Sequence, residues 1–210
     1  AIFLTMGVIL LGAYTRLTDA GLGCPDWPGC YGFLKVPHQE HHIAAAQQAF
    51  PDRPLVHHKA WNEMVHRYFA GSLGLLIAAI FFSSMFSRQG SRAVPAVLLL
   101  LVVFQAALGM WTVTLNLLPL VVMGHLLGGF SLLSLLAVYW LKLHPDYRVQ
   151  EPQLVSLKPF AVLAIIVLVS QIALGGWTAA NYAALACIEL PVCEQGWLER
   201  LNLSEAFDLH

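Results

Sequence analysis

Charged side chains are scarce in this 210-residue chain. Asp, Glu, Lys and Arg together make up 11% of it, whereas hydrophobic residues make up 58%, and the mean hydropathy is +0.68. Soluble domains carry about 25% charged residues, so this chain has too little charge to cover a surface that faces water. The formal net charge of −1 lacks the basic excess of nucleic-acid-binding proteins, so we expect no nucleic-acid partner. The class that remains is an all-α integral membrane protein in a lipid bilayer.

Cysteine is equally sparse, and it is absent from the apolar runs. Cys24 and Cys30 lie in one polar segment, and Cys187 and Cys193 lie in another with the same spacing. Disulfides persist in extracytoplasmic compartments. Each pair can form either a reducible, redox-active disulfide or a structural staple over the membrane helices. No Cys-x2-Cys ligand set is present, so structural zinc fits poorly.

Five apolar runs are the predicted membrane helices. A span needs about 20 residues, and the first run is shorter than that. All five are rich in Leu, Ile, Val and Ala with interspersed Gly, as membrane helices tolerate. They cover residues 1–14, 68–86, 94–115, 120–141 and 159–180.

The basic residues predict which side of the membrane each link faces. Arg88 and Arg92 follow the second run, and Lys142, Arg148 and Lys158 follow the fourth. Loops rich in Lys and Arg stay in the cytoplasm. We therefore expect a cytoplasmic amino terminus, with the loop 15–61 and the tail 181–210 on the outer side. All four cysteines then lie outside, where disulfides are permitted.

An internal repeat relates the two cysteine segments. At a constant offset of 163, residues 12–30 and 175–193 share seven identities, both cysteines included, and residues 105–112 echo 171–178. Such repeats indicate duplicated bundles. We expect an amino-terminal four-helix bundle at 1–142, a cytoplasmic linker at 143–158, and at 159–210 the first helix and cysteine loop of a second bundle. The chain is thus expected to be part of an eight-helix protein, and a complete five-helix protein is the alternative.

Two histidines are the candidate ligands. His66 lies at the outer end of the second helix, and His125 lies about five residues into the fourth, which places them at a similar depth. Ionisable groups inside a membrane are costly and indicate function. Two imidazoles on neighbouring helices can supply both axial ligands of a haem iron, so 1–142 is a candidate haem-binding bundle. In the alternative interpretation, His66 is an interfacial residue and His125 is a hydrogen-bonded packing residue.

Polar residues around His66 supply further candidates. Glu63 precedes His66 by three residues, so both share a helix face. Its carboxylate can handle a proton or stabilise positive charge. Alternatively, it is an interfacial carboxylate paired with Arg67. Arg16 and Arg67 are candidates for holding haem propionates, because guanidinium matches carboxylate geometry, and the alternative for each is a snorkelling interfacial arginine.

Histidine is concentrated in the first outer loop. A histidine-rich tract can bind copper or zinc. We favour instead a solvated loop with a short helix around residues 43–50 that ends at Pro51. The residues concerned are His38, His41, His42, His57 and His58.

The order of these motifs resembles that of the haem A synthases, membrane enzymes of cytochrome oxidase biogenesis. The likeness spans essentially the whole chain. It is carried by Thr15-Arg16-Leu17-Thr18, Gly21-Leu22-Gly23-Cys24-Pro25-Asp26-Trp27-Pro28, Cys30, Glu63-x-x-His66-Arg67, Gln105, Leu108-Gly109, Thr112-Val113, His125-Leu126, Cys187, Pro191 and Cys193.

The resemblance implies a fold and a reaction. Such enzymes consist of two four-helix bundles, each with a histidine pair, one for a haem b cofactor and one for the substrate haem O. They oxidise a methyl group of haem O to a formyl group. The resemblance implies that His66 and His125 bind haem iron, that Glu63 is an essential carboxylate, and that Cys24 and Cys30 form the first outer disulfide. Electrons would leave through the second haem or this cysteine couple.

The resemblance also implies a setting. The expected location is the bacterial cell (inner) membrane, with haem O synthase, oxidase assembly factors and further copies of the chain as candidate partners. The second histidine pair would fall beyond His210, so we expect the chain to be inactive alone. The alternative functions are a bis-histidine b-type cytochrome that only carries electrons, a membrane thiol-disulfide oxidoreductase, and a non-catalytic assembly factor.

Overall fold

The computed structural model describes residues 1–86, 92–144, 146, 152–183 and 202, and across these residues it contains helices and no strand. The second cysteine pair, Cys187 and Cys193, lies outside the described residues. The helices are α1 (Ile2–Leu17), α2 (Glu40–Ala49), α3 (His57–Phe86), α4 (Ala93–Thr114), α5 (Pro119–Leu143) and α6 (Lys158–Ala180), the last preceded by a 3-10 turn at Pro152–Leu157.

Within the part of the chain that the structure describes, four helical segments are long and apolar enough to cross a membrane: His57–Phe86, Ala93–Thr114, Pro119–Leu143 and Leu154–Ala180. At 1.5 Å per residue, even the 22 residues of α4 span about 33 Å, which exceeds a hydrocarbon core of about 30 Å. The predicted class, an all-α multi-pass membrane protein, is confirmed. The 16-residue helix α1 is apolar but shorter.

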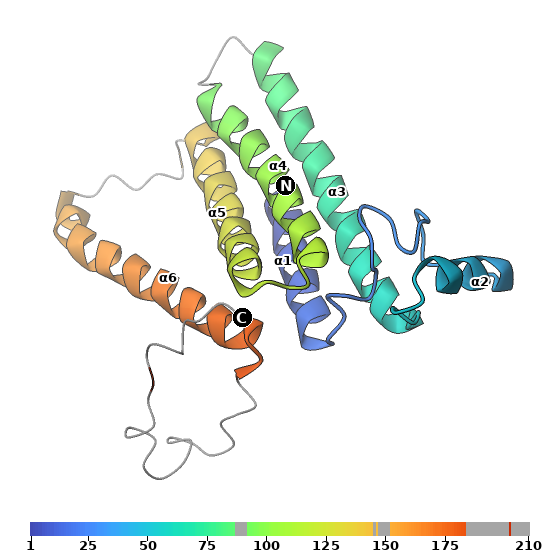
Figure 1. Cartoon of the computed structure of the whole chain (residues 1–210). Helices are drawn as coiled ribbons and strands as arrows, with labels where there is room; N and C mark the ends of the chain where they lie inside the picture. The colour runs from blue at the N-terminus through green and yellow to red at the C-terminus, as the bar shows by residue number, and fades with distance from the viewer. Residues whose placement is uncertain (87–91, 145, 147–151, 184–201, 203–210) are drawn as a thin grey trace.

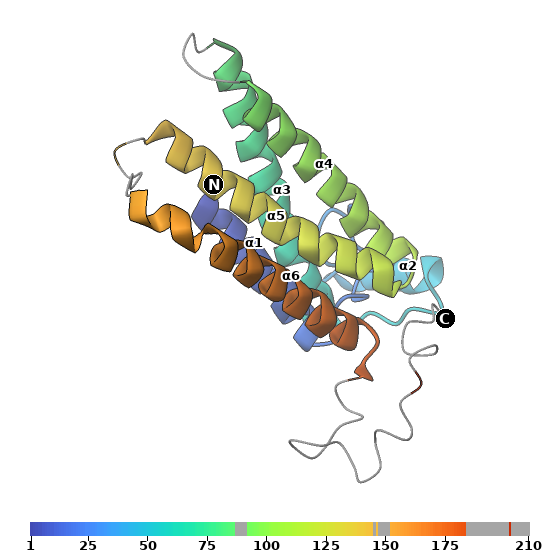
Figure 2. The same ribbon diagram turned by 90° about the vertical axis from the view of Figure 1, so that its left-hand side faces the viewer.

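Four helices close into a bundle, and a fifth lies outside it. α1 contacts α3, α3 contacts α4, α4 contacts α5, and α5 returns to α1. α6 packs against α5 on the outside of this ring (Figures 1 and 2). The expected arrangement of four helices plus one is therefore present. Apolar side chains of α6 such as Ile165 and Leu168 are more than half exposed, as expected for a face that meets lipid.

An apolar cluster packs the bundle away from the disulfide loop. Its buried members come from α3, α4 and α5, and side chains of α1 cover it. In lipid, this packing works through close van der Waals contact rather than through exclusion of water. The cluster consists of Leu73, Ile77, Leu98, Leu132 and Leu136.

The first loop is shorter than the predicted 15–61. α1 continues to Leu17, and α3 already begins at His57, well before the apolar run. The segment from His57 to Ala70 contains no Pro or Gly, so nothing interrupts the helix. Ala60, Glu63 and Met64 in this early part are buried. The short helix predicted around 43–50 is present as α2, which ends before Pro51.

Two side-chain contacts join positions that are 163 residues apart, the offset of the sequence repeat. Arg16 donates a hydrogen bond to the carbonyl oxygen of Ala179, and the Tyr182 hydroxyl lies 3.3 Å from Oδ1 of Asp19. The Arg16 guanidinium also lies 3.8 Å from the centre of the Tyr182 ring. These contacts place the carboxy-terminal end of α1 beside that of α6.

Candidate functional site

Two histidine rings lie close to each other inside the four-helix bundle. His66 lies near the amino-terminal end of α3, and His125 lies near that of α5. Their ring centres are 6.5 Å apart and their planes make an angle of 83°. The Nδ1 atom of each ring is buried, and neither has a hydrogen-bond partner within the described part of the chain. Buried polar groups are normally satisfied, so this pair indicates a site for a further group.

The spacing of the rings fits a shared iron ion. An iron held by both rings lies about 2 Å from each nitrogen, and each ring centre lies about 1 Å further, so the centres are separated by about 6 Å. The observed 6.5 Å agrees with this separation. A relative twist of the planes is permitted, because each imidazole can rotate about its bond to the metal. The donor set therefore fits a bis-histidine haem.

Glycines on the other two helices border these rings. A β-carbon added at Gly12 of α1 would lie 3.0 Å from Cε1 of His66. One added at Gly109 of α4 would lie 3.4 Å from Cε1 of His125. Larger residues would press on the imidazoles at both places. All four helices of the bundle thus contribute to the site.

The Glu63 carboxylate lies one turn from His66, but its oxygens contact the loop and a neighbouring side chain. The backbone N–H of Cys24 donates to Oε2 at 2.9 Å, and Nη2 of Arg67 lies 2.5 Å from Oε1. The residue is 4% exposed. A buried carboxyl group with a paired guanidinium and a backbone donor is held in one orientation.

Arg67 connects this carboxylate to the disulfide loop. Its Nη1 atom donates to the backbone oxygens of Asp26 at 2.9 Å and Pro28 at 3.4 Å, and to that of Gly29. Its Nη2 atom is paired with Glu63. These protein acceptors occupy both terminal nitrogens of the guanidinium. A haem propionate would have to bind the same two nitrogens, so it would compete with these contacts.

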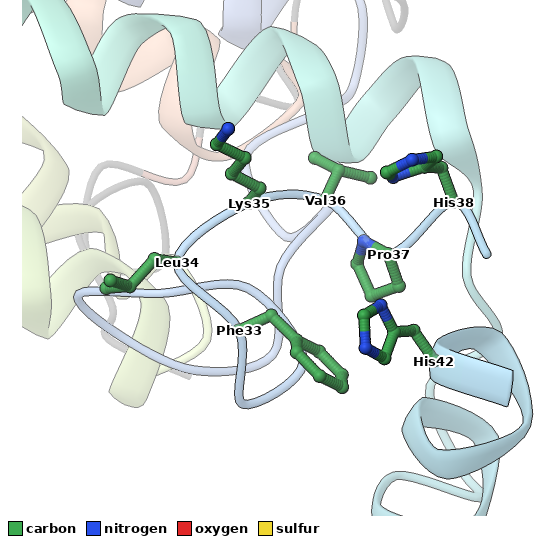
Figure 3. A pocket seen from close by; sticks show the side chains of 7 residues that line it. All are labelled: Phe33, Leu34, Lys35, Val36, Pro37, His38 and His42. Carbon is green, nitrogen blue, oxygen red and sulfur yellow. The ribbon is translucent and has the colours of Figure 1, made fainter.

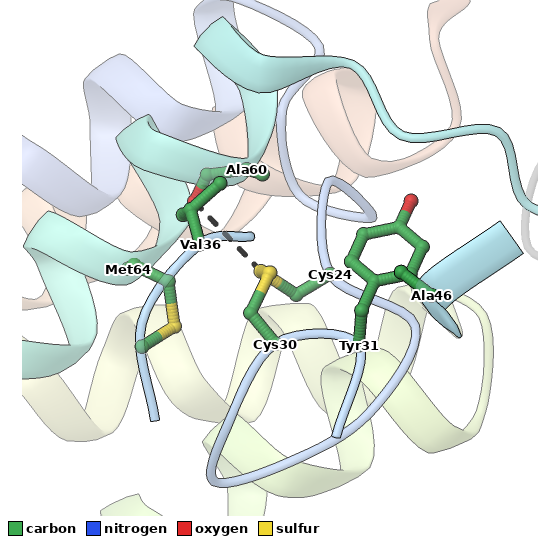
Figure 4. Packing of buried hydrophobic residues seen from close by; sticks show 7 residues of the cluster. All are labelled: Cys24, Cys30, Tyr31, Val36, Ala46, Ala60 and Met64. Carbon is green, nitrogen blue, oxygen red and sulfur yellow. Dashed lines mark hydrogen bonds between the residues drawn. A yellow bond between two sulfur atoms is a disulfide. The ribbon is translucent and has the colours of Figure 1, made fainter. Parts of the chain in front are cut away.

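Cys24 and Cys30 form a disulfide that is completely buried. It lies among apolar side chains from the loop, α2 and α3, and the Sγ atom of Cys24 is 3.7 Å from the Ala60 carbonyl oxygen (Figure 4). Thiol exchange requires access to a sulfur atom, so this burial favours the structural staple over a redox-active couple. The surrounding side chains are Tyr31, Val36, Ala46, Ala60 and Met64.

A family model described as COX15-CtaA, cytochrome oxidase assembly protein, matches residues 1–209. The chain belongs to this family. It is 53% identical over 204 residues to a heme A synthase of Shewanella oneidensis, covering 97% of this chain and 62% of that protein. It is 27% identical to a heme A synthase of Granulibacter bethesdensis, and the match covers 91% of this chain and 57% of that protein. It is also 27% identical to a heme A synthase of Halalkalibacterium halodurans, with 93% of this chain and 62% of that protein covered.

This COX15-CtaA family member spans about three-fifths of the length of the curated relatives that it matches. No solved structure matches it significantly. The family resemblance predicted from the motifs is therefore confirmed.

Arg16 of this family member lies away from the histidine pair. Its guanidinium contacts Ala179 and the Tyr182 ring at the meeting point of α1 and α6, as described above. Asp19 nearby pairs with Lys59 at 2.7 Å, and the hydrogen bond from Lys59 holds the pKa of this carboxyl below its usual value. A role of Arg16 toward a propionate stays a proposal.

The histidine-rich loop does not gather its imidazoles into one cluster. Among the described residues, no group of three or more His, Cys, Asp or Glu side chains is placed to hold a metal ion. His38 and His42 instead line an apolar cavity of about 250 Å³ (Figure 3). The rest of its wall consists of Phe33, Leu34, Lys35, Val36 and Pro37.

Gln105 of α4 is a further buried polar residue of the bundle that received no role from its residue type alone. It is 7% exposed, and its Nε2 atom has no hydrogen-bond partner among the described residues. Its signal in the sequence is the echo of residues 105–112 in residues 171–178, both of which begin with Gln.

Proposed function

We propose that the chain is the amino-terminal haem-handling part of a haem A synthase, an oxidoreductase that converts a methyl group of haem O to a formyl group. The observation that carries the proposal is the approach of two buried imidazoles, His66 and His125, whose ring centres are 6.5 Å apart and whose Nδ1 atoms have no hydrogen-bond partner among the described residues. The name of the Shewanella oneidensis relative, 53% identical, supports the same reaction.

His66 and His125 would bind the iron of the substrate haem O and hold its ring between α3 and α5. Haem b is the proposed cofactor of the whole enzyme, where bound iron supplies one-electron and oxygen chemistry. Gly12 and Gly109 leave room beside the two imidazoles. The side chains around the two histidines would orient the macrocycle and exclude water from it.

Glu63 would supply a fixed negative charge beside this site. Oxidation of a methyl group removes electrons and protons, and positive charge develops as the electrons leave. A carboxylate held by Arg67 and the Cys24 N–H cannot turn away, so its field acts without reorganisation. The same carboxylate can receive a proton when its pairing with Arg67 loosens.

The proposed setting is the bacterial inner membrane with a cytoplasmic amino terminus. The disulfide loop then lies on the outer side together with the histidine-proximal ends of α3 and α5. Support comes from the basic links at 87–93 and 142–158 and from the placement of all four cysteines in the two segments that would then lie outside. Haem O synthase and oxidase assembly factors are the proposed partners.

Expression of the chain in cells that make haem O tests the proposal. It should be produced alone and together with the carboxy-terminal two-fifths of the Shewanella oneidensis relative, and extracted haems should be separated by chromatography. We expect haem A from the pair, none with Glu63→Gln, and loss of the low-spin haem spectrum with His66→Ala. If the pair yields only haem O while the intact relative yields haem A, the proposed reaction is wrong. A haem-loaded but inactive pair would favour the electron-carrying cytochrome.

A further inference from the structure

Gln105 of α4 packs against the face of α5 that carries His125 and Gly128. A β-carbon added at Gly128 would come within 2.7 Å of Cδ of the Gln105 side chain, and one at Gly109 would meet the His125 ring. Gln105 and Gly109 share a face of α4, being four residues apart, and His125 and Gly128 share a face of α5. The amide and the imidazole are therefore neighbours across one helix–helix interface.

The amide lies about one helical turn beyond the imidazole level. α4 and α5 are joined by the short link 115–118 and run antiparallel. Gln105 is further from this link than Gly109, which faces His125. One turn corresponds to about 5 Å along the bundle. Helical side chains also lean toward their own amino terminus, which carries the Gln105 amide away from the link and the His125 ring toward it.

Nε2 of Gln105 is one of three buried side-chain atoms that lack a hydrogen-bond partner within the described part of the chain, and the other two are the Nδ1 atoms of His66 and His125. An unpaired buried amide nitrogen costs free energy unless a ligand satisfies it. Apolar packing does not explain an amide at this position, because Leu or Met would fill the same space beside Gly128 without that cost.

We propose that Gln105 is a specificity-determining residue for the macrocycle held by His66 and His125. It donates a hydrogen bond to an oxygen-bearing substituent at the edge of the macrocycle that lies further from the link 115–118. A hydroxyl or formyl oxygen can accept this bond, and a vinyl or methyl group cannot. This inference rests on the proposed function, since it requires a haem between the two histidines. It adds a reason why the site distinguishes haem O from haem b, which lacks the hydroxyalkyl group.

Titration of the purified chain with haem b and with haem O, followed at the Soret band, tests the assignment. The measured quantity is the ratio of the two dissociation constants, in wild type and in Gln105→Met, which keeps the size and removes the donor. We expect the preference for haem O to fall by about 3- to 10-fold, the range of a single neutral hydrogen bond in a membrane protein. Affinity for haem b should not change, and this also shows that the variant is folded.

Two further variants make the result decisive. Gly128→Ala displaces the amide without removing it and should lower the same ratio, whereas Gln47→Met, on the exposed side of α2, should leave it unchanged. An unchanged ratio in Gln105→Met overturns the inference. Equal weakening of both haems, with a shifted low-spin spectrum, also overturns it, because the amide would then position His125. If His66→Ala and His125→Ala leave both titrations unaltered, the proposed function itself fails.

Discussion

Replacement of Arg67 by Ala should release the disulfide loop from α3. The Arg67 side chain is 11% exposed and that of Glu63 is 6% exposed, so the variant leaves a buried carboxylate without its counter-charge. Breaking a buried ion pair in this way costs roughly 3–5 kcal/mol. The bonds from Arg67 to the backbone oxygens of Asp26, Pro28 and Gly29 are lost at the same time.

The rate of disulfide reduction measures this release. Cys24 and Cys30 are fully buried, so a reductant reaches them only when the loop opens, and the rate follows the opening equilibrium. An opening that is easier by about 3 kcal/mol corresponds to roughly 100-fold faster reduction. The chain should be treated with a phosphine reductant in detergent and its thiols counted by a maleimide gel shift. Cys187 and Cys193 should be replaced by Ser, so that the gel shift reports only the thiols of Cys24 and Cys30.

Matched variants separate the possible causes. Arg67→Lys keeps the positive charge but loses the planar guanidinium, so its rate of disulfide reduction should lie between those of the wild type and Arg67→Ala. Glu63→Gln combined with Arg67→Met leaves no buried charge and should open less readily than Arg67→Ala alone. Arg92→Ala, at the exposed start of α4, should reduce at the wild-type rate. If Arg67→Ala also reduces at that rate, the clamp formed by Arg67 does not hold the loop.

Two further predictions concern α1 and the loop after it. Gly12→Leu should weaken haem binding, because a β-carbon at this position would lie 3.0 Å from the His66 ring. A β-carbon at Gly7 of the same helix would meet no described atom within 4 Å, so Gly7→Leu should bind haem normally in a Soret titration. Asp19 has a pKa lowered by the hydrogen bond from Lys59, so its contribution to stability is complete above its unfolded value of about 3.9 and disappears as pH falls through the lower folded value. Both side chains are partly exposed, so Asp19→Asn should cost no more than about 1 kcal/mol at pH 7, and melting curves of wild type and variant should converge below pH 3.

The helices were predictable because the bilayer allows few alternatives. A run of about 20 apolar residues can satisfy its backbone in lipid only as a helix, and the four long spans begin or end close to the predicted runs. The start of α3 was not predictable from hydropathy. The segment at His57–Arg67 is polar, and its buried residues Ala60 and Met64 pack against the disulfide loop, which hydropathy does not indicate.

The candidate site was predictable in part. The approach of His66 to His125 follows from equal depth on two helices that run in the same direction, and their rings do meet. The partners of Arg67 did not follow from its position, because the backbone oxygens it contacts lie about 40 residues earlier in the chain. That Nε2 of Gln105 has no hydrogen-bond partner among the described residues could not be predicted either, since its hydrogen bonding depends on which groups the neighbouring helix places next to it.

The class of protein, the helical runs, the Cys24–Cys30 pair and the family could all be inferred from the sequence. These properties depend on composition and local spacing, because an apolar run of sufficient length can cross a bilayer only as a helix, and two cysteines a few residues apart lie in the same short loop. Three features came to light only when the chain was folded: Glu63 and Arg67 form a buried ion pair against the disulfide loop, Arg16 contacts Ala179, and Nε2 of Gln105 has no hydrogen-bond partner among the described residues. Each of these depends on contacts between segments far apart in the chain, whose geometry arises when the helices pack.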